Sequence, residues 1–535
     1  MTSAPASPAV PARAGLVLAA LILGAIVANV NLSVANIALP DIGRVFDATQ
    51  TQVNLVAIGC TLGLAMSVLY LGAVGDRYGR RMLLLLGMGL TIPFSFLCAY
   101  APDANALVAG RVLTGVAAGM AYPTTLALIT ALWASGPKRV AAIALWSGVS
   151  GGGAILGPVI AGALLESFWW GSVFLIAVPP AILALVIVML VVPAHVNESK
   201  DRVDHLSGAL SVAMVALLVL GLGIISAPGQ LATSLAMIGI AAALIGLFGW
   251  RQSQLASPLY DLKFARRRLF WVPALAGMIV FGSLMGAMFI GQQYLQDVLG
   301  YSTLDAGLAV LPAAIGMMGV APLSGRLVNT RGSKFTLLAG FACILPAFGV
   351  MLVGWRAGSP YVIVGFAYFL VGVGAGLALT PASRSLTSSI PVSHVGMASA
   401  TTDLQRDLGG SIMQAALGSL LTAGYAAAFS RAITASPEAN VVSDQTQTIL
   451  QQSFSSAVDL ADQYPQYATA IIAAAKSSFN AGAHWGFAAG SVFVALGALL
   501  VFLAFPGRRA EHDLLMAYQQ ADSVVADPGR TPSGG

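Results

Sequence analysis

Residues 52–81 read QVNLVAIGCTLGLAMSVLYLGAVGDRYGRR. The part that ends near Val74 is apolar and long enough to cross the hydrocarbon core of a bilayer as a helix. A helix is favoured there because it satisfies every backbone N–H and C=O group internally where no water is available. The glycines and charges of Gly72–Arg81 then mark a turn at the membrane surface. This stretch therefore predicts a membrane-spanning helix followed by a polar connection.

The same pattern recurs along the whole chain, in fourteen mostly apolar stretches between Ala14 and Gly507. Hydrophobic residues make up 57% of the 535 residues and charged residues only 9%, whereas a soluble domain has about 25% charged residues. The mean hydropathy is +0.84. The chain is therefore predicted to be an all-α polytopic membrane protein. The predicted spans are 15–38, 52–74, 82–101, 105–130, 141–165, 170–193, 206–226, 230–250, 269–293, 304–328, 335–356, 360–384, 395–427 and 485–506.

The distribution of Lys and Arg predicts the orientation of these spans. With the N-terminus inside, most of the 26 basic residues fall on inner segments, and this asymmetry places both termini in the cytoplasm. The expected location is the plasma (inner) membrane of a bacterial-type cell. The exceptions are Arg44, Arg356, Arg431 and Lys476 on outer segments, and Arg111 and Arg406 within spans.

An internal repeat divides the chain into two halves. The segment Gly72–Arg81 follows the second span, and Gly325–Lys334 follows the tenth with the same spacing of its glycines. Copies at corresponding positions indicate two duplicated six-helix units related by an axis along the membrane normal. The predicted units are a first bundle (1–193), two inserted helices (194–250), a cytoplasmic linker (251–268), a second bundle (269–506) and a cytoplasmic tail (507–535). The second bundle includes an extracytoplasmic segment, 428–484, which is expected to be a cap or a loosely ordered loop and could contain short amphipathic helices.

The turn after the second span has the features of a gating latch. Its glycines allow a tight turn, and Asp76 can accept hydrogen bonds from backbone donors at a helix N-terminus. Arg80 and Arg81 can pair with carboxylates across an interface. The alternative is topology alone, since basic loops face the cytoplasm anyway, but the second copy favours the latch. The predicted gating residues are Gly72, Asp76, Arg77, Gly79, Arg80 and Arg81.

Several motifs together resemble one family. Gly72–Arg81 is similar to the loop signature of the major facilitator superfamily, and Arg111–Gly115 resembles its R-x-x-x-G motif. Gly153–Gly162 resembles the G-x-x-x-G-P-x-x-G-G motif of its antiporters. Ser33–Pro40 and the segment 294–302 fit the 14-helix drug:proton antiporter branch. The resemblance implies two six-helix bundles plus two inserted helices, which alternate access to a central cavity and export lipophilic compounds against proton entry.

The fifth predicted span also has a reading that does not depend on the resemblance. Gly153, Gly157 and Gly162 remove side chains, so that a neighbouring backbone can approach closely. Pro158 weakens the helix locally and permits a bend. Tight packing without a role in transport is the alternative. The direction of transport therefore follows only from the resemblance.

Arg111 is an unusual residue because a cation within a span normally faces a cavity and has a partner. Asn31 is predicted to lie at similar depth on the first span, where the antiporter branch commonly has a titratable Asp. An unpaired Arg111 could recognise an anionic group of a substrate. Alternatively, helix dipoles and Asn29, Asn31 or Ser33 satisfy it, and its role is structural.

Proton coupling must then use other residues, and the thirteenth span offers Asp403, Arg406 and Asp407 on one polar stripe. Two carboxylates one turn apart repel each other, so one of them binds a proton more readily. The alternative is a gate ion pair that docks against Gly72–Arg81. Gln292 and Gln293 are predicted to line the mouth of the cavity.

The sequence contains no P-loop, no metal-ligand spacing and no nucleophile motif, so neither an enzyme nor a cofactor is predicted. Cys60, Cys98 and Cys343 all fall within spans and are expected to be packing residues. The expected partners are lipophilic small molecules, protons and membrane lipids, without nucleic acid, and the expected state is a monomer. The rival functions are a dedicated exporter of an endogenous anionic amphiphile such as a lipid or siderophore-like compound, a non-transporting membrane sensor and an uptake symporter.

Overall fold

The structure is a computed structural model that describes residues 13–133, 142, 145–146, 157–193, 203–225, 227, 229–255, 258–391, 395–436 and 442–526. Thirteen of the described helices are long and apolar enough to cross a membrane. The remaining predicted span, 141–165, lies largely outside the described residues, and its described residues, 142, 145–146 and 157–165, are helical. The prediction of an all-α polytopic membrane protein is confirmed.

The N-terminal half begins with a span whose helix continues, after a break at Val34, into a short second helix. The next helix starts at a capping box, in which the side chains of Thr49 and Gln52 each accept a backbone N–H of the other. Asp103 caps the fifth helix in a similar way. The helices are α1 (Ala14–Ser33), α2 (Ala35–Val45), α3 (Gln50–Tyr78), α4 (Arg80–Ala99), α5 (Ala104–Leu132), the helical residues 157–165, α7 (Ser172–Leu175) and α8 (Val178–Val191).

The two inserted spans lie between the halves in sequence and beside their interface in space. Helix α9 (His205–Ile224) packs against α3 of the first half and α17 of the second. Helix α10 (Leu231–Gln254) packs on α9, and only 17% of its apolar window is buried within the protein. The inserted pair therefore covers one side of the interface between the halves. A short helix, α11 (Leu262–Ala265), follows in the linker.

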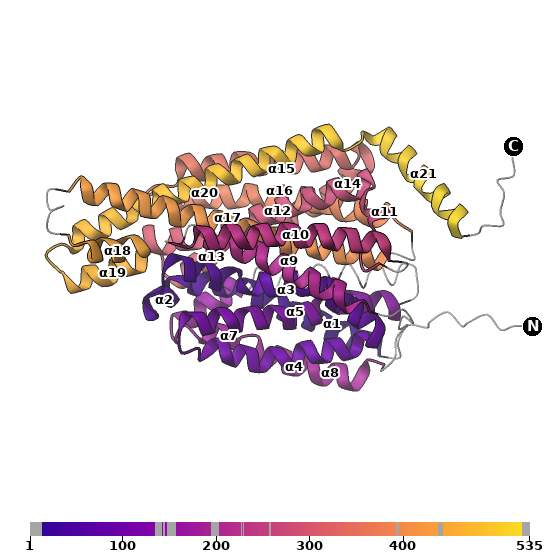
Figure 1. The fold of residues 1–535 in the computed structure, drawn as a ribbon, viewed down its shortest axis with the longest axis horizontal. Coiled ribbons are helices and arrows are strands. Elements are labelled where there is room, and N and C mark those ends of the chain that lie inside the picture. The colour runs from indigo at the N-terminus through magenta and orange to yellow at the C-terminus, as the bar shows by residue number, and fades with distance from the viewer. Residues whose placement is uncertain are drawn as a thin grey trace, which may run out of the picture.

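The C-terminal half forms the second layer of the molecule, and Figure 1 shows its orange and yellow helices beside the indigo and purple helices of the first half. Most of its spans are longer than those of the first half, and a π-helical turn ends the first of them. The elements are α12 (Arg268–Gln293), η1 (Tyr294–Val298), α13 (Thr303–Leu308), α14 (Leu311–Arg331), α15 (Ser333–Gly354), α16 (Tyr361–Ser388), α17 (Val395–Thr434), α18 (Asp444–Gln452), α19 (Phe454–Gln463), α20 (Ala468–Ala504) and α21 (Arg508–Ala526).

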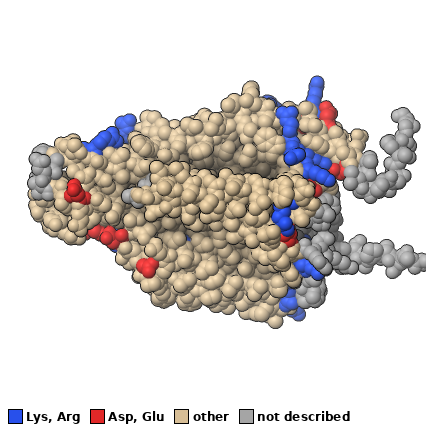
Figure 2. All heavy atoms as spheres, in the orientation of Figure 1, with Lys and Arg blue, Asp and Glu red and all other residues tan. Residues whose placement is uncertain are grey.

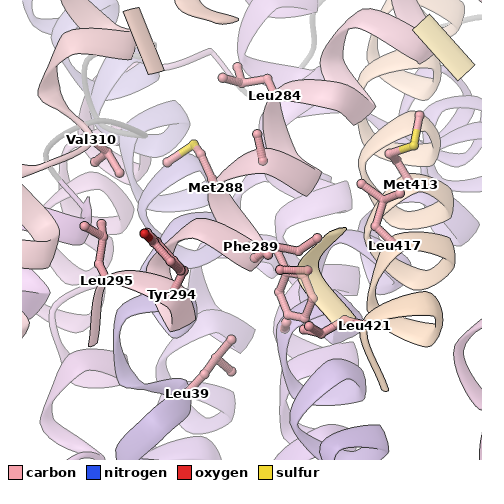
Figure 3. Packing of buried hydrophobic residues seen from close by; sticks show 14 of the residues in the cluster. Leu39, Leu284, Met288, Phe289, Tyr294, Leu295, Val310, Met413, Leu417 and Leu421 are labelled. Atoms are coloured by element: carbon pink, nitrogen blue, oxygen red, sulfur yellow. The ribbon is translucent and has the colours of Figure 1, made fainter. Parts of the chain in front are cut away.

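The largest apolar cluster joins the two halves. It includes Leu39 of α2 together with Phe289, Tyr294 and Leu417 of the second half, and these residues are all buried (Figure 3). Close van der Waals packing is a main favourable term in contacts between membrane-spanning helices, because lipid tails are as apolar as the side chains they would replace. The halves thus share one core at this end of the molecule instead of forming two separate cores.

The two copies of the repeated segment have the same backbone geometry. Gly79 ends α3 and precedes α4 with a φ of 115°, and Gly332 lies between α14 and α15 with a φ of 89°. Side chains disfavour this region of φ, so both copies require glycine at this position. The prediction of a loop over Gly72–Arg81 is wrong in extent, because Gly72–Tyr78 continue α3 and Gly79 alone separates the two helices.

Most described residues of the segment 428–484 are helical. Helix α17 continues to Thr434, α18 and α19 follow, and α20 begins at Ala468 instead of near residue 485. The early start of α20 follows from its alanine-rich first turns, since alanine has the highest helix propensity. In Figure 1 these helices project beyond the rest of the bundle, at the end opposite to α21. We call this region, residues 428–484, the cap.

Candidate transport pathway and gates

The predicted gating residues lie at the end of the molecule where α21 is found. Arg81 donates to the carbonyl oxygen of Met189 at 2.8 Å, and Arg80 donates to that of Ala127 at 3.4 Å. Both acceptors belong to the N-terminal half, so these two bonds hold the half together. Gly72 and Arg77 lie in the last turns of α3, and the side chain of Asp76 is outside the described part of the structure.

Arg111 is completely buried inside the N-terminal half. Its Nη1 donates to the backbone oxygen of Asn31 at 2.7 Å, its Nε donates to that of Val56 at 3.4 Å, and its guanidinium lies 5.5 Å from the ring centre of Phe174. Its Nη2 has no hydrogen-bond partner, and neither does the side-chain nitrogen of Asn31. Among the described residues no carboxylate forms an ion pair with Arg111. Carbonyl groups thus satisfy part of this cation, and its charge has no described counter-ion.

The glycine motif of the fifth span lies against both halves. A side chain at Gly157 would collide with Ser33 of α1, which itself donates to the carbonyl oxygens of Asn29 and Val30. A side chain at Gly162 would lie 2.9 Å from the Cα of Leu304 in α13. The close approach that these glycines allow is therefore present, and at Gly162 it joins the two halves. Gly153 lies outside the described residues.

The contact between residues 157–165 and the start of the second half also depends on a glycine on the side of the second half. A Cβ at Gly307 would lie 2.7 Å from the carbonyl oxygen of Pro158. Thr303 donates to the carbonyl oxygen of Gly162 at 3.3 Å. The backbones of the two halves therefore meet directly here. We call this end of the interface, where α13 meets residues 157–165, the outer seam.

Polar side chains continue the outer seam toward the middle of the molecule. Gln50 donates to the side-chain oxygen of Gln293 at 2.8 Å, and Asn54 donates to the hydroxyl of Thr422 at 3.0 Å. Each bond joins α3 to the C-terminal half. Gln292 is also buried, and its amide donates to the carbonyl oxygen of Ala306 while its own oxygen has no partner. The predicted mouth residues Gln292 and Gln293 thus lie in the seam.

The charged turn of α17 lies deeper in the interface. Arg406 donates to Asp407 at 3.3 Å, and Asp407 is almost completely buried. Arg406 also donates to the hydroxyl of Tyr122 on α5 at 2.7 Å, with its guanidinium 4.3 Å from the centre of the Tyr122 ring. Asp403 lies one turn earlier and is 9% exposed. The structure thus brings this turn against α5 of the other half, and not against Arg80 and Arg81.

Four buried polar atoms in the middle of α17 have no hydrogen-bond partner. They are the second carboxylate oxygen of Asp407, Nη2 of Arg406, and the side-chain oxygens of Gln405 and Gln414. Unpaired buried polar groups are costly, and they occur mainly where water, an ion or a ligand binds. Such a concentration on one helix at the interface between halves is suited to a pathway that binds solutes.

Sequence reasoning missed the partners of these residues. Tyr122 lies in an apolar span and gives no signal by itself, because tyrosine is equally common at membrane interfaces. Gln50 and Asn54 share one helix face at a spacing of four, and this polar pair at the start of an apolar span was a usable signal.

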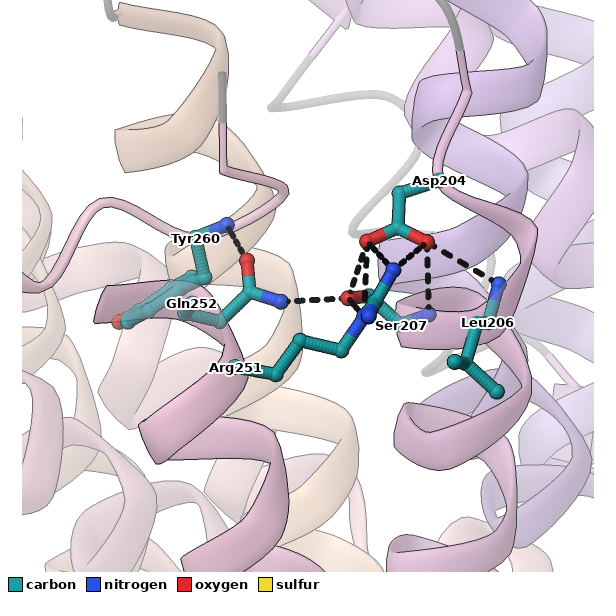
Figure 4. A network of polar contacts seen from close by, with 6 residues as sticks. All are labelled: Asp204, Leu206, Ser207, Arg251, Gln252 and Tyr260. Carbon is teal, nitrogen blue, oxygen red and sulfur yellow. Dashed lines mark hydrogen bonds and ion pairs between the residues drawn. The ribbon is translucent and has the colours of Figure 1, made fainter. Parts of the chain in front are cut away.

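A second missed network ties the inserted helices to each other and, through the linker, to the second half (Figure 4). Arg251 at the end of α10 donates to both carboxylate oxygens of Asp204, at 2.9 and 3.0 Å from Nη2. Gln252 donates to Ser207 at 2.7 Å and accepts from the backbone N–H of Tyr260 at 3.0 Å. The Tyr260 hydroxyl in turn accepts from Thr401 of α17 at 3.3 Å.

Comparison with known proteins agrees with the geometry. The sequence profile described as Major Facilitator Superfamily matches residues 21–414. The chain is 30% identical to the multidrug efflux pump LfrA of Mycolicibacterium smegmatis over 94% of this chain and 98% of that protein. It is 31% identical to the multidrug resistance protein Stp of Mycobacterium tuberculosis, over 77% and 76% of the two chains. It is 29% identical to the methyl viologen resistance protein SmvA of Salmonella typhimurium, over 87% and 93%.

Solved structures have the same fold at low sequence identity. A bacterial homologue of the human lysosomal transporter Spinster, in an inward-facing and occupied conformation, matches with a TM-score of 0.64 and 16% identity, over 93% of this chain and 98% of that one. A D-xylose–proton symporter matches with a TM-score of 0.58 and 14% identity, over 92% and 98% of the two chains.

Proposed function

Because the chain belongs to the major facilitator superfamily, in its 14-helix drug:proton antiporter branch, we propose that it is a secondary active exporter of lipophilic small molecules driven by proton entry. The family and the fold are those of a transporter rather than an enzyme. Several relatives carry the name of a multidrug efflux pump or drug resistance protein, and these names support export of lipophilic compounds. The transporting unit in this proposal is one chain.

The observation that carries the proposal is the charged turn Asp403–Asp407 at the interface between the halves. A charged residue inside a membrane protein is costly and is typically retained for function. Here Arg406 bonds to its neighbour Asp407 and to Tyr122 of the opposite half. Separation of the halves would break the bond to Tyr122 and expose the turn to solvent. This contact is therefore suited to a gate that responds to the charge of the turn.

Charge counting suggests how a proton couples to this gate. The turn carries two carboxylates, Asp403 and Asp407, and a single cation, Arg406, which pairs with Asp407 in a largely buried site. One added proton would make the turn electrically neutral, and a neutral turn is easier to bury than a charged one. We therefore propose that proton uptake favours one arrangement of the halves and proton release the other. Both earlier readings of this turn, the gate and the proton relay, are then two aspects of one device.

The substrate is proposed to bind between the halves, where apolar walls surround few polar groups. Burial of apolar surface stabilises a bound molecule by about 25 cal/mol per Å² with little demand on geometry. The unpaired side-chain oxygen of Gln414 offers an acceptor to donor groups on a substrate. A site of this kind accepts many lipophilic compounds.

The orientation of the chain is also a proposal. Helix α21 and the start of α1 lie at the same end of the bundle (Figure 1). Figure 2 shows that most visible Lys and Arg residues gather at that end. Since basic residues are enriched on the cytoplasmic side, we infer that both termini face the cytoplasm and that the cap faces outward. The location is then the plasma (inner) membrane.

Flux into inverted vesicles tests the function. Cationic, neutral and anionic amphiphiles are offered, and a pH-sensitive dye inside the vesicles reports proton movement. The expected result is uptake of lipophilic compounds that depends on a proton gradient and releases protons from the vesicle interior. No flux of any compound in well-folded protein would favour the non-transporting sensor, and movement of substrate together with protons would favour an uptake symporter.

Arg111 supports one alternative, an exporter dedicated to an anionic amphiphile. Its Nη2 and the side-chain nitrogen of Asn31 are buried donors without partners, and an anionic group could accept from both. The test is the variant Arg111→Ala in the same vesicles, with anionic and neutral substrates compared. A selective loss of anionic transport supports this alternative. Equal transport of both classes by well-folded Arg111→Ala protein leaves Arg111 with a structural role.

A further inference from the structure

The cap contains a cavity of its own, separate from the charged turn of α17. Its volume is about 370 Å³, within the range that holds small ligands in other proteins. Four elements contribute to its walls, because the end of α17 and the start of α20 extend past the bundle and hold α18 and α19 between them. The apolar part of the lining includes Phe429, Ile433, Leu450, Leu460 and Ile471.

The chemistry of this cavity selects an uncharged ligand. No Lys, Arg, Asp or Glu is among its described lining residues. Hydroxyl groups of Thr446 and Tyr464 offer hydrogen bonds at a few places on an otherwise apolar wall. A charged group would lose its hydration here without gaining a partner, and an apolar group would be removed from water.

Contacts within the cap hold the cavity open in advance of binding. The Tyr425 hydroxyl lies 2.9 Å from the carbonyl oxygen of Ser453 and 3.2 Å from that of Leu450, and it thereby fastens the turn between α18 and α19 to α17. Phe454 packs edge-on against Phe479 of α20 at 6.5 Å between ring centres. A preformed site binds with a smaller loss of conformational freedom than one that must first order its walls.

The cap also contacts the first half beside the outer seam. Ser456 donates to Asp47 at the end of α2 at 3.3 Å, and a side chain at Gly43 would collide with Ser455. Tyr425 lies one turn beyond Thr422, whose hydroxyl accepts from Asn54 in the seam. A molecule that leaves through the outer seam would therefore meet the cap next.

We propose that the cap cavity is an exit site, which binds the uncharged lipophilic part of an exported compound after it has passed the outer seam. This inference rests on the proposed export function and adds a second ligand site to it. The occupant is the exported compound. A membrane lipid chain, which has similar chemistry, is the occupant that the test must distinguish.

The test uses N-phenyl-1-naphthylamine, a neutral lipophilic dye whose fluorescence rises in apolar surroundings, with the full-length protein in lipid nanodiscs. Wild-type protein is expected to show saturable binding beyond that of empty nanodiscs. Ala474→Phe adds bulk to the cavity wall and is expected to weaken binding at least tenfold. The control Val362→Phe introduces the same side chain at a position 76% exposed, and it should bind the dye like the wild type.

Ile471→Ala is a second variant, which removes apolar contact from the cavity wall instead of adding bulk. It allows the proposal to be tested even if Ala474→Phe does not fold. A several-fold weaker affinity is expected from Ile471→Ala. Unchanged dye affinity in both folded variants would overturn the exit site. The exit site would also be overturned if lysophosphatidylcholine displaced the dye and the compounds that the vesicle assay identifies as exported did not.

The proposed export function and the exit site can be contradicted independently of each other. Flux in inverted vesicles reports on export without reference to the cap, and the change in dye affinity between wild type and the two cap variants reports on the cap. Export by a wild-type protein that shows no saturable dye binding would overturn the exit site and leave the proposed function intact. Absence of export of every compound would overturn the proposed function instead.

Discussion

At the scale of single residues, Asp407 is the carboxylate best placed to carry a proton. One of its oxygens accepts from Arg406 and the other has no partner, although the residue is buried. A proton on that free oxygen would remove the excess negative charge of the turn. We expect Asp407→Asn to abolish efflux driven by a proton gradient, while exchange of labelled for unlabelled substrate continues without a gradient.

The measurement compares gradient-driven efflux with exchange in the same vesicles. Asp462→Asn, an exposed residue of the cap, serves as the control and should retain both activities. Gradient-driven efflux by Asp407→Asn at wild-type rates would exclude this carboxylate as the proton carrier. Loss of exchange as well as efflux would indicate a gate without a role in coupling.

Tyr122 is the residue through which the charged turn reaches the opposite half. Tyr122→Phe keeps the ring that lies under Arg406 and removes only the hydroxyl that accepts from it at 2.7 Å. A hydrogen bond that involves a charged group contributes about 1.5–3 kcal/mol to stability. We therefore expect a lower thermal unfolding midpoint in detergent and slower transport.

The control for this substitution is Tyr100→Phe, at a tyrosine that is 63% exposed. It removes the same atom from a position without a described side-chain hydrogen bond. Equal unfolding midpoints for the two variants would show that the bond between Arg406 and Tyr122 does not stabilise the closed interface.

At the scale of elements, the packing of α13 on residues 157–165 determines whether the outer seam can close. A side chain at Gly307 would lie within 3 Å of the Pro158 carbonyl oxygen. Overpacking of this kind costs about 1–3 kcal/mol, which corresponds to about a 5- to 150-fold shift between two states. We expect Gly307→Leu to favour an arrangement with the seam open and to reduce transport strongly.

Labelling of Asn54→Cys with a membrane-impermeant maleimide measures the opening, in a background from which Cys60, Cys98 and Cys343 have been removed. The labelling rate should rise in Gly307→Leu. Gly319→Leu on α14 is the matched control, because a side chain there would meet nothing within 4 Å. Equal labelling rates in both variants would contradict a role for Gly307 in closing the seam.

The ion pair between α9 and α10 predicts how the stability of the folded protein depends on pH. Partial burial raises the pKa of Asp204, but hydrogen bonds from Arg251 and Ser207 outweigh this effect and lower the pKa to about 2. A carboxyl group with a lowered pKa stabilises the folded state above its unfolded value of about 3.9, and this contribution disappears as the pH falls toward the folded value. Asp204→Asn should therefore lower the unfolding midpoint at pH 7.

The difference in midpoint between wild type and Asp204→Asn should shrink as the pH falls from about 4 toward about 2, since the wild-type carboxyl then becomes protonated. Thermal unfolding of both proteins in detergent at several pH values measures this difference in midpoint. A difference that stays constant down to pH 3 and below would show that the ion pair with Arg251 does not stabilise the helix pair.

At the scale of the whole molecule, alternating access requires the outer seam to open and close in every cycle. Asn54 and Thr422 belong to opposite halves and lie within 3.0 Å of each other at their side-chain atoms. We expect the double variant Asn54→Cys/Thr422→Cys, in the cysteine-free background, to form a disulfide on oxidation. The disulfide should abolish transport, and reduction should restore it.

The two single-cysteine variants are the controls for this experiment, and oxidation should leave their transport unchanged. Full transport by the oxidised double variant, with the cross-link verified by mass spectrometry, would contradict the rocking of two halves about this seam.

Much of the architecture could be predicted from local sequence. The ends of α3, α9 and α16 lie within a few residues of the predicted spans, because the length of an apolar run is fixed by the thickness of the bilayer. The positive φ of Gly79 and of Gly332 agrees with the two copies of the turn motif. The cap was harder to predict, since α18 and α19 are short helices whose stability depends on the helices that hold them.

What the sequence alone determined is therefore local: the positions of most spans, the bias of basic charge and the glycines at two equivalent turns. Only the tertiary structure decided which polar residues meet. The pairs Gln50–Gln293, Asn54–Thr422 and Tyr122–Arg406 are separated by 243, 368 and 284 positions in the chain. Hydropathy sets where a helix enters and leaves the membrane. The partners of its side chains depend instead on the rotation and tilt of the helix, which are fixed by its packing against all the other helices.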